Sequence, residues 1–264
     1  MDPILQRMPQ RSSPEESIRH FYLSILDEMD RRKVYPAAIK PNSAYYEAVS
    51  VQAVAVLQEL IQAYSQRGVL VVLDAKRGDI GKSSSAYAQA AFEVMQADAV
   101  TISPYMGSDS VSPFLQWNEE RGAYILLRTS NPGSKDLQDQ PLKDGKPFWK
   151  AVAEQLLLWN NGSLGAVVGA TNLSEMEKIA RFFADRQTEI PFLIPGLSVP
   201  GVAGQQGGEA AEVMQALRNG GSARSIHLLN SSSGLSFAFE ATPGVSFWVA
   251  CVDALERLSA QSRF

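Results

Sequence analysis

The chain has 264 residues, of which 45% are hydrophobic and 20% charged, and its formal net charge is −4. This composition suits one large globular domain, and the mildly acidic balance argues against a nucleic-acid partner, whose phosphates require a basic surface. No apolar run is long enough to cross a membrane and the N-terminus has no signal-peptide pattern, so we expect a cytoplasmic protein without a membrane partner.

Cysteine and histidine give no indication of a metal or cofactor. Cys251 is the single cysteine in the sequence, which fits a reducing compartment, and its apolar neighbours indicate an inert, buried thiol. His20 and His227 are far apart and lack ligand spacing, so we expect no metal site.

Short apolar runs alternate with longer helical patterns along the chain. The strands are almost continuously apolar, which is typical of parallel strands covered on both faces. Such repeated units favour a doubly wound sheet or a (β/α)8 barrel. In chain order we expect helix 15–32, strand 35–40, helix 43–66, strand 69–74, helix 82–96, strand 99–103, helix 108–118, strand 124–129, helix 147–160, strand 165–169, helix 173–186, strand 192–195, helix 207–219, strand 226–230 and helix 244–260.

A helix precedes the first predicted strand, and only seven strands are visible. A barrel normally begins with a strand, so we expect an α/β fold of the (β/α)8 TIM-barrel type whose first strand is truncated at the N-terminus. No linker or low-complexity tract divides the chain, and residues 1–264 are expected to form a single barrel domain with a long loop at 131–146.

Charged residues collect where the first two predicted strands end. Lys40 ends one strand, Asp74 and Lys76 follow the next, and Asp79 begins the loop after it. Chemistry in such barrels gathers at the carboxyl ends of the strands, and residues two apart on an extended segment share a side. We therefore expect a Lys-Asp-Lys-Asp array in which each carboxylate keeps its neighbouring ammonium charged. A purely structural ion-pair network at the barrel rim is the alternative interpretation.

Glycines recur at the ends of the later strands. Backbone N–H groups can approach a ligand closely at such positions, and the last loops of these barrels often hold phosphate. Any one of these glycines, taken alone, is better explained as an ordinary turn residue. Their shared position is the argument for a phosphate site, and they are Gly169, Gly196, Gly207, Gly208 and Gly234.

With these motifs in order, the sequence resembles the orotidine 5′-phosphate decarboxylase family, in its bacterial branch with the D-A-K-R-G-D-I motif. The resemblance covers nearly the whole chain. It implies a barrel that works as a homodimer without a cofactor and converts orotidine monophosphate to UMP and carbon dioxide. It is carried by "DAKRGDIGKSSSAYA" (74–88), "DAVTISPYMGSDSVSPF" (98–114), "LLRTSNPGSKDLQ" (126–138), "GAVVGAT" (165–171) and "LIPG" (193–196).

The resemblance implies roles for the charged array. Lys76 would protonate C6 of the pyrimidine, and Asp74 would lie against the substrate carboxylate. Lys40 completes the array, while Asp79 and Ser83 would reach into the site of the partner subunit. The family usually has threonine where Ser83 stands, so a hydroxyl is retained.

The resemblance also implies substrate contacts outside the array. Ser130 would bind the amide edge of the pyrimidine, Asp2 the ribose, and Pro195 the substrate at the end of its strand. Gln206, Gly207 and Gly208 would lie at the phosphate.

Three departures from the family pattern affect the expected site. Asp2-Pro3 follow Met1 directly, so the residues of the family's first strand are absent. The loop 195–208 is longer than usual, which leaves the phosphate glutamine open between Gln205 and Gln206. Ser233 stands where the family has a phosphate-binding arginine, and Arg224 lies before the strand, so we expect weakened phosphate binding.

Two other functions remain open from the sequence. A sugar-phosphate decarboxylase or aldolase of the same superfamily would use a magnesium ion near the same motif, and EDTA would abolish its activity. A non-catalytic remnant that binds nucleotides weakly would fit the departures, although the intact Lys76 argues against it.

Overall fold

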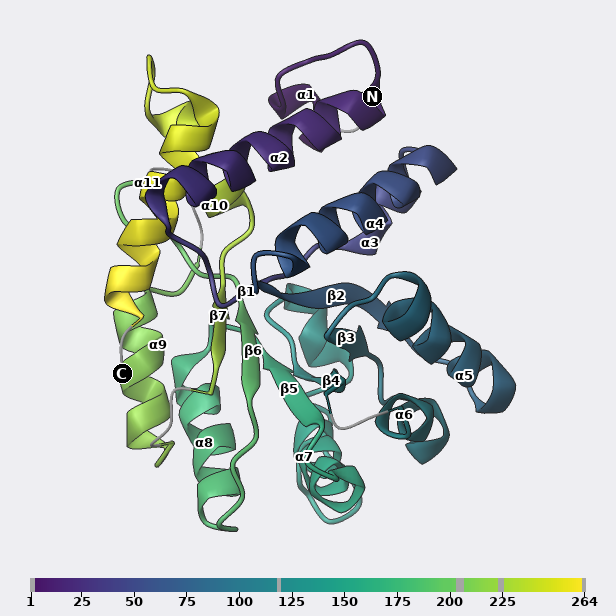
Figure 1. Cartoon of the computed structure of the whole chain (residues 1–264). Coiled ribbons are helices and arrows are strands. Elements are labelled where there is room, and N and C mark those ends of the chain that lie inside the picture. The colour runs from purple at the N-terminus through teal and green to yellow at the C-terminus, as the bar shows by residue number, and fades with distance from the viewer. Residues whose placement is uncertain (1–2, 118–119, 203–206, 223–225, 263–264) are drawn as a thin grey trace.

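Figure 1 shows a curved parallel sheet surrounded by helices in this computed structural model, which describes residues 3–117, 120–202, 207–222 and 226–262. Each strand pairs in parallel with the next one along the chain, and among the described residues no pairing joins the last strand back to the first. The prediction of a TIM-type barrel is confirmed, since the seven parallel strands form a nearly closed barrel. The strands are β1 (Ala38–Ile39), β2 (Leu70–Arg77), β3 (Ala99–Ile102), β4 (Gly122–Arg128), β5 (Leu164–Val168), β6 (Phe192–Pro195) and β7 (Leu228–Asn230).

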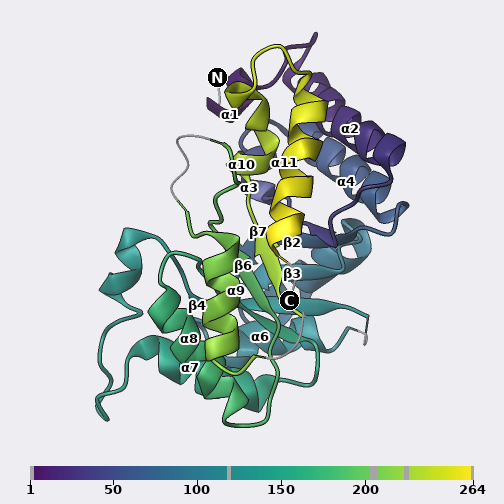
Figure 2. The ribbon, with the colours of Figure 1, turned by 90° about the vertical axis from the view of Figure 1, so that its left-hand side faces the viewer.

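The helices cover the outer side of this sheet. In Figure 2 the first helices and the last helix lie together at one end, with α7 to α9 at the other. The larger helices are α2 (Pro14–Arg32), α4 (Val51–Ser65), α5 (Gly81–Gln89), α6 (Ser108–Leu115), α7 (Phe148–Trp159), α8 (Leu173–Ala184), α9 (Ala210–Asn219) and α11 (Phe247–Gln261). The short ones are α1 (Pro3–Arg7), α3 (Ser43–Glu47), the π-helix η1 (Ala90–Val94), the 3-10 helices η2 (Pro132–Asp136) and η3 (Ala238–Ala241), and α10 (Ser233–Ser236).

Several predicted boundaries were wrong for local reasons. The single helix expected at 43–66 is two, because the Ser50 hydroxyl caps a new helix by accepting a hydrogen bond from the Ala53 N–H at 3.0 Å. The helix expected at 82–96 changes into a π-helix at Ala90. The short helices that follow β7 were not expected at all. Strand 35–40 shrinks to β1, while β2 continues past Asp74 to Arg77.

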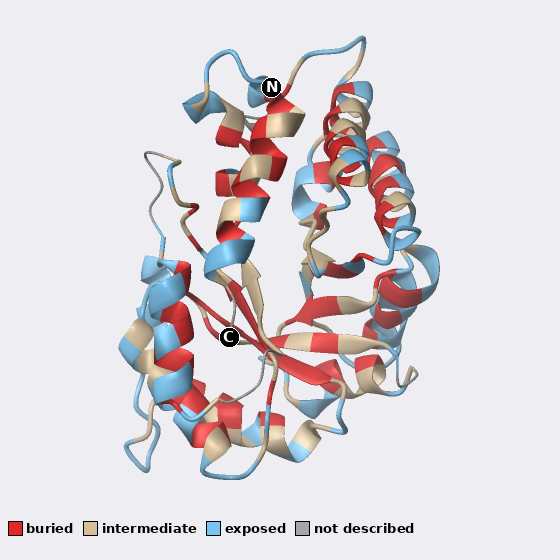
Figure 3. Ribbon diagram, turned by 60° about the vertical axis from the view of Figure 1, so that its left-hand side comes forward, coloured by how far each residue is buried: buried red, intermediate tan, exposed pale blue. Residues whose placement is uncertain are grey.

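Alternating residues of each strand supply two cores. The side chains on the outer face of the sheet pack against the helices and form the larger core. Figure 3 shows these buried residues in red on the strands and on the facing sides of the helices. The other set fills the inside of the barrel with Val72, Val167 and Leu193, against which Tyr124 packs. Gly165 makes room for that ring, since a Cβ atom there would lie 2.5 Å from Tyr124 ring carbons.

The seam between β1 and β7 opens onto an apolar cavity of about 500 Å³ between α2, α4 and α11. Cys251 lines it, and its Sγ donates a hydrogen bond to the carbonyl of Ser236 at 3.3 Å. Burial raises the pKa of this thiol to about 12. The thiol is therefore protonated at neutral pH and behaves as buried apolar filling, as the sequence predicts.

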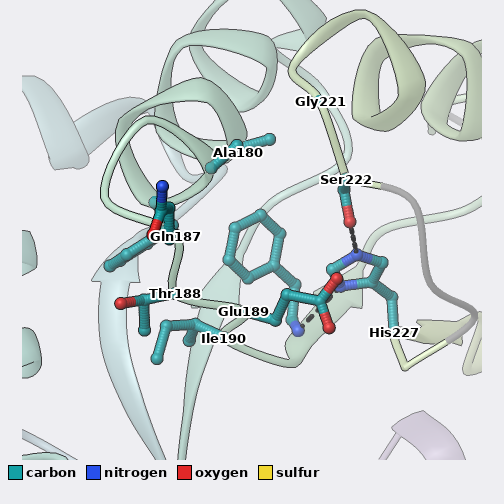
Figure 4. Close-up of a pocket in the computed structure, with 11 residues that line it drawn as sticks. Ala180, Gln187, Thr188, Glu189, Ile190, Gly221, Ser222 and His227 are labelled. Carbon is teal, nitrogen blue, oxygen red and sulfur yellow. Dashed lines mark hydrogen bonds between the residues drawn. The ribbon is translucent and has the colours of Figure 1, made fainter.

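His227 fastens the amino ends of β6 and β7 to each other beside a cavity of about 450 Å³ (Figure 4). Its Nδ1 accepts a hydrogen bond from the Phe192 N–H at 3.0 Å, so Nε2 carries the proton and faces the Ser222 hydroxyl at 2.7 Å. Burial lowers the pKa of this imidazole to about 4, so it is neutral at physiological pH.

His227 should make stability depend on pH. Its pKa in the folded chain lies below the ordinary value of about 6.5, so between pH 6.5 and 4 the unfolded chain binds the extra proton. Its contribution to the free energy of unfolding should be complete above pH 6.5 and decline by up to about 3 kcal/mol by pH 4. Urea titrations of the unaltered chain and of His227→Asn, which keeps an acceptor near Nδ1, should therefore converge as the pH falls. Parallel curves would contradict a neutral, buried imidazole.

Candidate active site

Three of the predicted charged residues meet at the carboxyl end of β2. The Lys40 ammonium lies 2.6 Å from one carboxylate oxygen of Asp74, and the Lys76 ammonium lies 2.6 Å from the other. The Asp74 and Lys40 side chains are only 6% and 10% exposed, whereas that of Lys76 is 48% exposed. One ammonium thus holds the carboxylate from inside, and the second remains accessible to a ligand.

The backbone of β2 makes this arrangement possible. Val72, Asp74 and Lys76 have the same parity, which directs Asp74 into the barrel above the Val72 side chain. The pairing register with β3 shifts between Leu73 and Arg77, and Lys76 adopts a left-handed conformation with φ of 46°. A lysine in that region is strained, and such strain is found at functional sites where the surroundings enforce it.

Thr101 on β3 ties the distorted strand to the carboxylate. Its hydroxyl donates to Asp74 at 2.9 Å and accepts the Lys76 backbone N–H at 3.0 Å. The threonine is fully buried and was not identified from the sequence. A hydroxyl two residues before the end of an apolar strand was the only available signal.

Opposing effects set the ionisation of Asp74. Burial by itself raises its pKa, but the charge of Lys40 and the hydrogen bonds from Lys40 and Lys76 outweigh burial and hold the pKa below the usual range. Asp74 is consequently an anion at neutral pH, placed between two cations.

Asp79 does not join this group within the described chain. Its carboxylate instead accepts the backbone N–H of Ile80 at 2.7 Å, and no ion pair links it to Lys40 or Lys76 in that part of the structure. The expected four-residue array is therefore a three-residue array in one chain. Ser83 lies near Asp79 on the exposed side of α5.

Ser130 lies among the glycines that follow the later strands. A Cβ atom on Gly169 would lie 2.7 Å from the Ser130 Cβ, and one on Gly196 would lie 4.0 Å from its hydroxyl oxygen. A Cβ atom on Gly207 would likewise lie 2.6 Å from the Gly196 carbonyl oxygen, and one on Gly208 would lie 2.5 Å from the Ala170 carbonyl oxygen. Because these glycines have no side chain, the loops after β4 to β6 can pack closely against one another at the carboxyl end of the barrel, where a ligand would bind.

A cavity of about 610 Å³ opens at the ends of β6 and β7, which is ample room for a nucleotide-sized ligand. Lys40 lines this cavity as well as contacting Asp74, so the cavity and the charged array adjoin. Pro195 and Ser233, both predicted site residues, are also in its wall. The described residues that line it are Arg7, Lys40, Pro195, Gly196, Leu197, Val202, Asn230, Ser231, Ser232, Ser233, Phe237, Glu240 and Ala241.

A buried arginine anchors the long loop at 131–146 and was not found from the sequence. The Arg128 guanidinium, at the end of β4, binds Glu175 at 2.6 Å, Asp139 at 2.9 Å and the Ser134 hydroxyl at 2.8 Å. Gln138 in turn accepts the Thr129 N–H at 2.9 Å. These contacts anchor the first half of the loop, next to Ser130, to the end of β4.

Some predicted contacts fall outside the described residues, namely Asp2, Gln205, Gln206 and Arg224. Within the described ranges, no cluster of three or more His, Cys, Asp or Glu side chains is placed to hold a metal ion. The helices in the same ranges include none that is long and apolar enough to span a bilayer.

Comparison with known proteins gives one consistent family. Residues 22–223 match the model of the "Orotidine 5'-phosphate decarboxylase / HUMPS family". An orotidine 5′-phosphate decarboxylase of Roseiflexus sp. (strain RS-1) is 42% identical over 219 residues, which are 82% of this chain and 75% of that protein. One from Haloarcula marismortui is 43% identical over 245 residues, covering 91% of this chain and 81% of the relative.

Solved structures agree. The OMP decarboxylase of Leishmania donovani superposes with a TM-score of 0.73 at 32% identity, covering 97% of this chain and 91% of that one. The UMP synthase of the same organism gives a TM-score of 0.75 at 33% identity, covering 98% of this chain and 54% of the synthase.

The array predicts unequal effects of two alanine substitutions on stability. Asp74→Ala leaves the buried Lys40 without its counter-ion and should lower the free energy of unfolding by about 3–5 kcal/mol. Lys76→Ala removes a half-exposed ammonium while Lys40 still pairs with Asp74, so it should cost less than about 1 kcal/mol. Urea denaturation monitored by circular dichroism measures both. Similar losses in the two variants would show that Lys40 does not depend on Asp74.

Proposed function

This chain belongs to the orotidine 5′-phosphate decarboxylase family, and we propose from that premise that it converts orotidine 5′-monophosphate to UMP and carbon dioxide. It is thus a carbon–carbon lyase of pyrimidine nucleotide biosynthesis. The observation that carries the proposal is the Lys40–Asp74–Lys76 contact set, in which the Lys76 ammonium is accessible and Lys40 lines a nucleotide-sized cavity. We also propose a cytoplasmic location, for which the single cysteine is the support.

The reaction needs a cation already in place at C6 of the pyrimidine. The bond between C6 and the carboxylate carbon breaks, carbon dioxide leaves, and the electron pair stays on C6. Lys76 Nζ then gives one proton to C6 to form UMP and regains a proton from solvent. Because the Lys76 ammonium is held 2.6 Å from Asp74, its charge is oriented before the reaction begins, which lowers the barrier without reorganisation.

Asp74 contributes through the charge that moves during the reaction. A substrate carboxylate placed near it is repelled in the ground state, and the repulsion falls as carbon dioxide departs. Lys40 keeps Asp74 ionised throughout, since the two side chains are buried in contact. Ser130 is assigned to the amide edge of the pyrimidine, and Pro195, Gly207 and Gly208 to the substrate wall at the end of β6.

The active form is proposed to be a homodimer whose copies share their sites. Asp79 and Ser83 lie outside their own chain's array, and the large side chains of Ile80, Tyr105 and Met106 are exposed. A Cβ atom on Gly78 would lie 3.8 Å from the Met106 methyl, so the two loops that carry these side chains are neighbours. An apolar surface next to an unused carboxylate suits a second copy of this chain.

Lys76→Ala tests the chemical assignment. Removing the proton donor should abolish turnover of orotidine monophosphate, while the dissociation constant for UMP changes much less, because the lysine acts mainly in the transition state. Ultraviolet absorbance follows the reaction and calorimetry measures UMP binding. A variant that kept most of its kcat would overturn the assignment of Lys76.

Sharing of sites is tested by mixing two inactive proteins. Lys76→Ala chains and Asp79→Ala chains should each be inactive, and in a mixed dimer one of the two sites would receive an intact residue from each copy. Activity should therefore return on mixing, up to about a quarter of the normal activity per site when random exchange makes half the dimers mixed. Mass spectrometry of the intact dimers checks that exchange has occurred. Exchange without recovered activity would contradict shared sites.

A further inference from the structure

The cavity at the ends of β6 and β7 has little positive charge available for an anion. Among the described residues that line it, Arg7 and Lys40 are cationic and Glu240 is anionic. Lys40 is already paired with the buried Asp74 at 2.6 Å. Arg7 is therefore the cationic side chain of this wall that is not committed to the array.

Arg7 reaches the cavity from α1, near the start of the chain. Its guanidinium carbon lies 3.8 Å from the centre of the Phe237 ring, and the stacking fixes the plane of the group. The Nε and Nη2 atoms each donate to Glu240 at 2.7 Å, so one edge of the guanidinium is used. Nη1 keeps its two protons for a further acceptor, as far as the described residues show.

The segment after β7 offers hydroxyls but no cation. The Ser231 hydroxyl is buried and donates to the Leu197 carbonyl at 2.7 Å, so it holds the two loops together. Ser232 and Ser233 are exposed in the cavity wall. A serine hydroxyl supplies one neutral donor, whereas a phosphate dianion is best matched by the charged fork of an arginine.

We infer that Arg7 supplies the positive charge that binds the 5′-phosphate of the nucleotide, from α1 rather than from the segment after β7. The inference rests on the proposed function, because it places a nucleoside monophosphate in this cavity. Nη1 of Arg7 donates to the phosphate, while Phe237 and Glu240 hold the guanidinium in position. Ser232 and Ser233 complete the polar wall.

Glu240 has two opposing effects in this arrangement. It orients Arg7, but it also places a negative charge next to the phosphate and neutralises part of the arginine's charge. Removing the charge of Glu240 should therefore strengthen phosphate binding, whereas removing Arg7 should weaken it. If the Arg7–Glu240 pair had only a structural role, removing either charge would change the affinity for UMP in the same direction.

The test uses calorimetric titration of the full chain with UMP and with uridine, which lacks the phosphate. Arg7→Gln should weaken UMP binding about 10- to 100-fold and change uridine binding less than about 2-fold. Glu240→Gln should strengthen UMP binding several-fold with uridine unchanged. Ser233→Arg, added to Arg7→Gln, should restore most of the lost UMP affinity. Arg19→Gln is the matched control, because the Arg19–Glu59 pair is equally exposed but lies outside the cavity.

The outcomes separate this inference from the proposed reaction. Equal effects of Arg7→Gln on UMP and uridine, or weaker UMP binding in Glu240→Gln, would overturn the role of Arg7. Turnover of orotidine monophosphate by the unaltered chain is measured independently. If turnover is absent but Arg7→Gln still weakens UMP selectively, the inference stands and the proposed reaction fails. If turnover is present and Arg7→Gln leaves UMP affinity unchanged, only the inference fails.

Discussion

The burial of one carboxylate constrains the whole reactive end of this barrel. An ionised Asp74 inside the sheet is costly unless every oxygen lone pair that loses water finds a donor. Lys40 directly after β1, Lys76 from β2 and Thr101 from β3 provide those donors, so three adjacent strands must end in register. The strained backbone of Lys76 follows from this requirement, because the bulge in β2 is what brings its ammonium back to the carboxylate. The positive charge offered to a ligand is thus fixed by the fold itself.

The charged array and the cavity wall near β7 differ in burial and in how their charges are exposed to solvent. The Lys40–Asp74–Lys76 group is buried on one side and tightly paired, so its charges are little screened by salt. The wall near β7 is open and polar, and it carries the exposed charges of Arg7 and Glu240. Binding energy gathered at such an open wall can align a substrate against the rigid group without disturbing it. Lys40 belongs to both regions and links them.

The strands could be predicted from the sequence because their apolar residues recur in a regular pattern. Helix breaks and contacts between distant residues could not be predicted, because no local pattern marks them. Seven apolar runs identified seven strands, and the spacing of Asp74 and Lys76 predicted that their side chains share one side of the strand. The break at Ser50 was missed because Val49 and Val51 continue the apolar pattern through the cap. Thr101 and Arg128 were missed because their partners, Asp74 and Glu175, lie far away along the chain. The position of Arg7 depends on packing of α1 against the segment after β7, which no local pattern encodes.

The unpaired seam between β1 and β7 bears on how the chain assembles. Each recorded strand pairing joins neighbours in sequence, such as Ala38 with Leu70 or Leu193 with Leu228, so each closes a loop of a few tens of residues. A pairing of Ala38 with Leu228 would instead require closure over 228 − 38 = 190 residues, and the described sheet contains no such pairing. Because folding slows as the sequence separation of the required contacts grows, the sheet can build up from consecutive strand units, and closure over long separations is left to the helices. The packing of α2 on α11 and the ion pair between Arg7 and Glu240, 233 residues apart, join the two ends of the chain.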